Sequence, residues 1–181
     1  MRLLPLLLAS LAAAFAPALA DQRSEALPAL FDELLEAPDA TMASRLEARI
    51  WQEWLDAPDP VSRTLMARLD AAMRSRDSAL ALEIADELVA VAPEFAEAWN
   101  KRATIHYLRG DDDASVSDIR ETLALEPRHF GAISGLGLIF LRRGDPEAAL
   151  GAFEQVLEIS PASANARRSV ERVRREIGRE I

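Results

Sequence analysis

Cysteine is absent from this chain of 181 residues, which excludes disulfide bonds, thiolate catalysis, cysteine-ligated zinc and a lipid-modified amino-terminal cysteine. Histidine is nearly absent: only His106 and His129 could take part in a histidine-based metal site or catalytic triad. Glycine is scarce, at 7 residues, whereas 50% of the chain is hydrophobic and 28% is charged. This composition is typical of a soluble, helix-rich protein and not of a disordered one.

Basic residues are outnumbered by acidic ones, and the formal net charge at pH 7 is −9. We expect no nucleic-acid partner, because phosphate neutralisation requires a basic face. The charge is uneven, since residues 127–181 carry nine arginines and seven acidic residues, a net charge of +2. The acidity therefore lies almost entirely before Pro127.

Residues 1–20 predict an export signal, with one arginine, an apolar run and the small-x-small sequence Ala18-Leu19-Ala20. We expect cleavage after Ala20 and a periplasmic mature chain. An uncleaved membrane anchor is the alternative, but residues 3–20 are barely long enough to span a bilayer and contain Pro5 and Pro17. After cleavage we expect no membrane association.

Three evenly spaced prolines mark a fixed period in the rest of the chain. The interval from Pro93 to Pro127 equals the interval from Pro127 to Pro161. Pro127 and Pro161 each follow the same series of segments: an apolar-periodic segment, a Gly-Asp turn and a second apolar-periodic segment. Such a period is typical of a solenoid, in which each unit is too thin to bury its own apolar face and must stack on its neighbours.

A less regular unit ends at Pro93, and its packing positions keep the period. Leu65 stands one period before Trp99, which stands one period before Ile133. Small residues recur where the second helix of each unit must approach its neighbour closely, at Ala81, Ser115 and Ala149.

The turn inside each unit also repeats. Arg76 takes the place of the glycine found at Gly110 and Gly144, and an acidic residue follows in all three units. An acid there can cap the second helix by accepting hydrogen bonds from its free N–H groups. These acids are Asp77, Asp111 and Asp145.

Two helices are predicted before the array, in residues 21–61. The second is expected to start near Thr41, a candidate N-cap. Its Trp51 and Trp54 are expected to pack in the core rather than to form a ligand platform. Because Phe31 and Trp99 are separated by twice the period, the pair is either a degenerate repeat or a cap.

A last helix is predicted in residues 162–181, with a stripe formed by Ala166, Val170, Val173 and Ile177. Terminal repeats need a polar outer surface, so we expect this helix to solvate the end of the stack. Docking on an anionic membrane or an acidic partner is the alternative. The arginines on its other face are Arg167, Arg168, Arg172, Arg174 and Arg175.

Together these residues resemble the tetratricopeptide repeat (TPR) family, whose 34-residue pattern has Trp, Leu-Gly and Tyr, then Gly-Asp, then Ala, an aromatic or branched residue and a closing Pro. The matches in one copy are Trp99, Gly110, Asp111, Ile119 and Pro127, and in the next Leu136, Gly137, Phe140, Gly144, Asp145, Ala149, Phe153 and Pro161. Arg102, Ala103 and His106 depart from the pattern. The chain also resembles small exported TPR proteins of Gram-negative bacteria that have no assigned activity.

The resemblance implies an all-α, right-handed solenoid of antiparallel helix hairpins with terminal capping helices. Its three units would cover residues 62–95, 96–129 and 130–163. The first helices would line a concave groove that suits an extended peptide or a partner helix. By the family register, the groove side chains would be Arg63, Met66, Asp70, Met73, Glu97, Asn100, Thr104, Tyr107, Leu108, Ser134, Leu138 and Leu141.

One specialisation of the family, the carboxylate clamp for chaperone carboxyl termini, is absent. It requires Lys and Asn on the first unit, Asn on the second, and Lys and Arg on the third. The corresponding residues here are Met66 and Asp70, then Lys101, then Gly131 and Gly135.

Residues for catalysis are few. We expect His106 to pack between helices, and His129 to lie near the groove mouth as a contact residue rather than a catalytic one. The acidic run at 111–113 is not a calcium loop of the EF-hand type, because its twelfth position is Thr122 instead of glutamate. We therefore expect a protein-interaction scaffold with a protein partner, and no enzyme activity, catalytic residue, metal, cofactor or small-molecule substrate. An envelope-associated structural protein docking through its arginine-rich last helix is the alternative.

Overall fold

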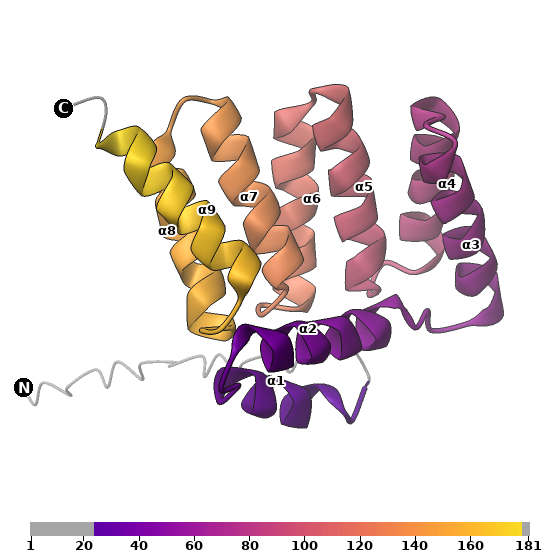
Figure 1. Ribbon diagram of the computed structural model, residues 1–181. Helices are drawn as coiled ribbons and strands as arrows, with labels where there is room; N and C mark the ends of the chain where they lie inside the picture. Colours follow the sequence, from indigo (N-terminus) through magenta and orange to yellow (C-terminus); the bar gives the residue numbers. More distant parts are fainter. Residues whose placement is uncertain (1–23, 179–181) are drawn as a thin grey trace, which may run out of the picture.

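A computed structural model describes residues 24–178, and these residues form nine helices and no strand (Figure 1). The predicted export signal and its cleavage site lie outside the described residues. The helices are α1 (Leu27–Leu35), α2 (Ala40–Leu55), α3 (Pro60–Arg74), α4 (Ser78–Val91), α5 (Ala96–Arg109), α6 (Asp112–Leu125), α7 (Phe130–Arg142), α8 (Pro146–Ile159) and α9 (Ala164–Ile177). None of them is long and apolar enough to cross a membrane.

The predicted stack of antiparallel hairpins is confirmed. Helices α3 to α8 form three hairpins, and each second helix packs on the first helix of the next unit. Figure 1 shows α5, α7 and α9 in one layer, with α6 and α8 behind them. The first helices therefore share one face of the stack.

Hydrogen bonds from side chains define where the second helices begin. Asp77, Asp111 and Asp145 each accept a hydrogen bond from the backbone N–H three residues later, at 2.9 to 3.1 Å. The predicted capping role of the repeated acid is thus confirmed. The same chemistry starts α2 slightly earlier than expected: the N-cap is Asp39, whose carboxylate accepts from the N–H of Met42 at 2.8 Å, and Thr41 lies inside the helix.

The turn before each of the caps Asp77, Asp111 and Asp145 contains a residue in the left-handed backbone conformation. Gly110 and Gly144 have φ angles of +83° and +74°, and Arg76 adopts a φ of 59° at the equivalent place. Glycine adopts this conformation without a steric penalty, whereas a side chain makes it unfavourable. The first unit therefore carries backbone strain that the other two avoid.

Close packing explains the small residues. Ala81, Ser115 and Ala149 are buried, as predicted. Gly137 is a further close approach, because a Cβ atom there would lie 2.7 Å from the ring of Phe153. The first and second helices of the third unit touch at this point.

Arg102, which departs from the apolar family pattern, joins three helices by charge. Its guanidinium donates two hydrogen bonds to Asp118 of α6, both at 2.8 Å, and one to Asp86 of α4 at 2.9 Å. The hydrogen bond with Asp118 raises the pKa of Arg102 above its ordinary value, so the group stays charged. An ion pair here replaces the apolar contact between units.

Helix α9 begins after the N-cap Ser163. Its predicted stripe is confirmed, because Val170 and Val173 pack against Ala149 and Phe153 of α8. The arginines of α9 are exposed, and Arg174 pairs with Glu154 of α8 at 2.7 Å.

Helices α1 and α2 do not continue the stack. They lie across the end where α5, α7 and α9 begin, with α2 running transverse to those helices (Figure 1). Phe31 and Trp54 share one apolar cluster with Phe130 and Ile133 of α7. The amino-terminal pair thus covers one edge of the array. Trp54 lies in the core as predicted, whereas Trp51 is half-buried and packs against that core.

Candidate protein-binding groove

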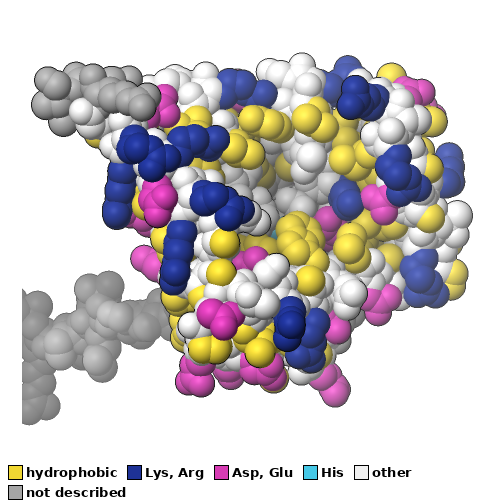
Figure 2. Space-filling view, in the orientation of Figure 1, with side chains coloured by type: hydrophobic (Ala, Val, Ile, Leu, Met, Phe, Trp, Pro, Cys, Tyr) yellow, Lys and Arg dark blue, Asp and Glu magenta, His cyan; other side chains and the backbone are white. Residues whose placement is uncertain are grey.

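The shared face of the first helices is hollowed. Figure 2 shows the hollow near the middle of this face, with hydrophobic side chains gathered around it and Lys and Arg side chains along α9. Leu108 of α5 is 71% exposed and Leu138 of α7 is 38% exposed. Two large apolar side chains that the family register assigns to the concave side are thus open to solvent.

The structure separates the predicted groove residues into three groups. Arg63, Thr104, Leu108 and Leu138 are exposed. Asp70, Met73, Tyr107, Ser134 and Leu141 are half-buried. Met66, Glu97 and Asn100 are buried, so the expectation that these three side chains face an open groove is corrected.

Met66 is inside for a simple reason. It is 6% exposed and belongs to the apolar cluster of the first unit, together with Leu65 and Leu69. Its thioether side chain fills space between α3 and its neighbours. The groove therefore loses one apolar contact at this end.

Glu97 and Asn100 belong to a buried polar network around His129. The amide of Asn100 donates to Glu97 at 2.9 Å, and Nε2 of His129 lies 3.1 Å from the same carboxylate oxygen. Nδ1 of His129 accepts from the N–H of Ala132 at 3.1 Å, so it is unprotonated and Nε2 is the donor to Glu97. His129 is 0% exposed, and the expectation of a contact residue at the groove mouth is corrected.

Helix α2 covers this network. Trp54 stacks on the ring of His129 with 4.0 Å between centroids, and a Cβ atom on Gly131 would lie 2.7 Å from Trp51. The groove was expected to take an extended peptide or a partner helix, but the part where α5 and α7 begin is occupied by the chain's own tryptophans. The open part lies toward the other ends of these helices.

Two contacts between units shape the open part. Arg142 of α7 stacks on the ring of Tyr107 at 3.8 Å and donates to its backbone carbonyl at 2.8 Å. Lys101 of α5 pairs with Asp70 of α3 at 2.9 Å. Neighbouring first helices are thereby held in register, and both basic groups already have partners.

A cavity of about 280 Å³ lies between α2, α7 and α9. Trp51 and Leu138 contribute apolar wall, and Ser134, Asn165 and Ser169 contribute polar groups. The remaining lining residues are Glu47, Phe130, Gly131, Phe153, Val156, Ser163 and Ala166. This cavity lies on the α9 side of the part that the tryptophans occupy, and it can accept a side chain from a bound segment.

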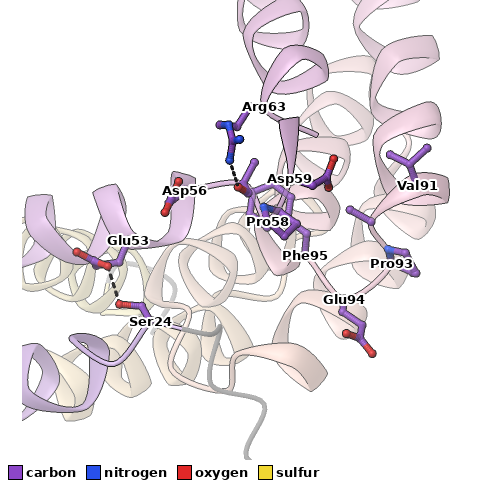
Figure 3. Close-up of a pocket in the computed structure, with 12 residues that line it drawn as sticks. Ser24, Glu53, Asp56, Pro58, Asp59, Arg63, Val91, Pro93, Glu94 and Phe95 are labelled. Carbon is purple, nitrogen blue, oxygen red and sulfur yellow. Dashed lines mark hydrogen bonds between the residues drawn. The ribbon is translucent and has the colours of Figure 1, made fainter. Parts of the chain in front are cut away.

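A larger cavity of about 670 Å³ lies between the α2–α3 connection and the start of α5 (Figure 3). Acidic side chains gather at it, including Glu53, Asp56 and Asp59, and the hydroxyl of Ser24 donates to Glu53 at 2.6 Å. Nη1 of Arg63 donates to the carbonyl of Ala57 at 3.3 Å. These contacts fix the connection from α2 to α3.

The acidic run at the start of α6 connects units. Asp112 pairs with Arg142, and Asp113 pairs with Arg143 at 2.7 Å. Within residues 24–178, no group of three or more His, Asp or Glu side chains is arranged to hold a metal ion. The run contributes ion pairs between the second and third units.

Sequence reasoning missed the contribution of α9 to this face. Asn165, Arg168 and Arg172 follow Gly131, Ser134 and Leu138, which lie on the groove side of α7, by one full period. Continuing the repeat period into the last helix, as if that helix were the first helix of a fourth unit, could have identified them.

Comparisons with known sequences agree with this architecture. The family model described as tetratricopeptide repeat matches residues 66–121 and 113–164. A TPR repeat-containing protein of Rhizobium etli is 38% identical over 144 residues, which are 80% of this chain and 71% of that protein. The small glutamine-rich tetratricopeptide repeat-containing protein 2 of Saccharomyces cerevisiae is 32% identical over 93 residues, 51% of this chain and 27% of that protein.

Solved structures share the fold. The Sgt2 TPR domain from Aspergillus fumigatus superposes with a TM-score of 0.62 at 25% identity, covering 67% of this chain and 82% of that domain. The first TPR of Spaghetti, bound to an HSP90 peptide, superposes with a TM-score of 0.61 at 17% identity, covering 65% of this chain and 93% of that one.

Proposed function

Because the chain belongs to the tetratricopeptide repeat family, we propose that it is a protein-interaction module whose concave groove binds a segment of a partner protein. Binding alone, without bond chemistry, is the mechanism. The groove takes up a peptide or a partner helix along the open ends of α5 and α7.

The exposure of Leu108 is the observation that carries this proposal. The family register assigns this leucine to the concave face, and a partner that covers its 71% exposed side chain stabilises the complex by removing apolar surface from water. The same register assigns Tyr107 and Leu138 to this face as further apolar groups, and Thr104 as a hydroxyl group. Such a mixture provides apolar anchors with polar contacts around them.

The HSP90 peptide held by one structural neighbour is a precedent for peptide binding by this fold. The ligand of this chain is proposed to differ, because the clamp positions hold other groups. Met66 is buried, Asp70 is paired with Lys101, and Gly131 lies under Trp51. A terminal carboxylate therefore lacks its usual set of basic and amide partners.

A periplasmic location is part of the proposal and is supported by the export signal predicted in residues 1–20. Expression of the full chain in a Gram-negative host, followed by fractionation and mass measurement, tests it. The expected product is periplasmic and starts at Asp21. A cytoplasmic product that still begins at Met1 would contradict this location but not the groove.

Partner capture with matched variants tests the groove. A photo-crosslinking residue at Thr104 of the mature chain should join a discrete protein in host extract. Leu108→Asp should abolish that product, because a charge replaces the apolar contact. Leu35→Asp, at a leucine that is 55% exposed on α1, should leave it unchanged. Binding through this groove would be refuted if both variants lost the crosslinked product equally, or if neither variant lost it.

A further inference from the structure

We propose that the bound segment is acidic and carries an apolar side chain next to its acidic residue. The apolar side chain enters the cavity between α2, α7 and α9, and the carboxylate pairs with Arg168 and Arg172. This inference rests on the proposed function and specifies the chemistry of its partner.

The arginines of α9 stand on the concave side by register and by packing. Arg168 and Arg172 occupy the positions that Ser134 and Leu138 hold on α7, one period earlier. The buried stripe of α9, which includes Val170, packs on α8 and leaves both arginines exposed. Helix α9 therefore acts as a fourth first helix that adds a basic wall to the groove.

These two positive charges are available to a ligand. Arg168 donates a hydrogen bond to the side chain of Asn165, which lines the cavity. Arg172 has no hydrogen bond or ion pair within the described part of the chain. By contrast, Arg174 on the same helix pairs with Glu154 of α8 at 2.7 Å.

Two basic groups on α5 and α7 are already neutralised. Lys101 pairs with Asp70 at 2.9 Å, and Arg142 pairs with Asp112. Arg63, the remaining basic residue predicted for the groove, lies beside the α2–α3 connection and not at this cavity, whereas Arg168 and Arg172 have no acidic partner among the described residues. A carboxylate of the ligand therefore finds an attractive partner on the α9 side of the cavity.

The cavity itself selects an apolar side chain and sets its orientation. Phe130, Phe153 and Val156 are buried side chains of its lining. Glu47 lies on the α2 side, where its carboxylate accepts from the hydroxyl of Ser160 at 2.9 Å. A ligand carboxylate is repelled from Glu47 and directed to the α9 side.

The net charge of −9 does not oppose this arrangement strongly. At physiological ionic strength the Debye length is about 8 Å, so acids farther away are screened and the nearest charges decide. The residues from 127 onward have a net charge of +2, in contrast to the rest of the chain. The local field thus favours an acidic segment.

Three synthetic peptides of equal length test the inference by fluorescence anisotropy with the mature chain. The first has a Leu-Phe pair flanked by glutamates, the second has the same pair flanked by lysines, and the third has Ser-Ser between glutamates. We expect the first peptide to bind at least about tenfold more tightly than either of the others, because only it offers both anchors. Its affinity should fall as NaCl is raised.

Matched variants assign the contacts. Arg168→Gln with Arg172→Gln should weaken the first peptide about three- to tenfold, whereas Arg174→Gln, which removes one positive charge from the same helix, should have no effect. Ser134→Phe should fill the cavity and abolish the preference for Leu-Phe. Circular dichroism checks that each variant is folded.

The outcomes separate this inference from the proposed function. Equal binding of the glutamate and lysine peptides, or no effect of the double arginine variant, would overturn the acidic segment. If crosslinking at Thr104 still depended on Leu108, the groove would stand. Arginine-dependent binding to phosphatidylglycerol vesicles with no peptide preference would also overturn the inference, because the basic wall would then serve a lipid surface.

Discussion

The ring of His129 stacks on the indole of Trp54, with 4.0 Å between centroids and 11° between planes. This contact joins α2 to the residue that caps α7. The other side of the histidine is bound to Glu97 of α5 at 3.1 Å. Three helices from distant parts of the chain thus meet at one imidazole, which holds the amino-terminal pair on the array.

Trp54→Ala should therefore destabilise the protein by about 3–5 kcal/mol, because a fully buried indole leaves a cavity. Trp54→Phe should cost less, since an aromatic ring remains and the indole N–H has no partner among the described residues. Urea denaturation measures both. Leu55→Ala, at an exposed neighbour, is the control, and equal losses at Trp54 and Leu55 would contradict the role of the stack.

Replacing either of two helical glycines by alanine should change the stability of the protein, in opposite directions for the two positions. Gly137→Ala should destabilise by about 1–3 kcal/mol, because the new methyl group would lie 2.7 Å from Phe153. Gly151→Ala should stabilise by up to about 1 kcal/mol, since nothing lies within 4 Å of its Cβ position and alanine favours the helix. Thermal and urea unfolding of the pair provide the comparison.

Arg76→Gly should stabilise the first unit by about 0.5–1 kcal/mol, because Arg76 holds a φ of 59° that glycine adopts freely. Ser75→Gly is the control, since Ser75 has an ordinary φ of −77° and gains nothing from glycine. A stability increase in the control as large as in Arg76→Gly would show that backbone strain is not the cause.

Asp59 should make stability depend on acid pH. Hydrogen bonds from the hydroxyl and the N–H of Ser62 lower the pKa of Asp59 below its ordinary value of 3.8. A carboxylate with a lowered folded-state pKa contributes stability that is fully present above 3.8 and is lost as pH falls through the folded-state value.

Melting temperatures of the protein and of Asp59→Asn should therefore differ near pH 7 and converge as the pH falls below the folded-state pKa of Asp59. Ser62→Ala removes the strongest of these hydrogen bonds and should shift the acid transition to higher pH. A difference between Asp59→Asn and the parent that stays constant down to the most acidic pH would contradict the assignment.

The repeating part of the fold could be predicted because its signals are local. The even spacing of the prolines, the acid after each turn and the small residues at Ala81, Ser115 and Ala149 are read from short stretches, and each has its cause within one hairpin or its neighbour. The stripe of α9 was predictable for the same reason.

Part of the groove assignment could not be made in this way. The family register places Glu97 and Asn100 on the concave face, but it carries no information about α2, which lies across the end of that face where α5 and α7 begin. Arg168 and Arg172 were missed as groove residues because their helix was treated as a solvating end.

The sequence alone determined that this protein is an all-α stack of three helix hairpins. Periodic burial, capping acids and turn residues in the left-handed conformation all depend on residues that are close in the chain or in adjacent hairpins. Tertiary structure decided where the amino-terminal pair packs, which part of the groove stays open and which arginines border it. Those features depend on contacts between distant residues, such as the hydrogen bond from Ser160 to Glu47, 113 positions apart. No local pattern encodes such a contact, because it forms only when α2 finds its complementary surface on the assembled array.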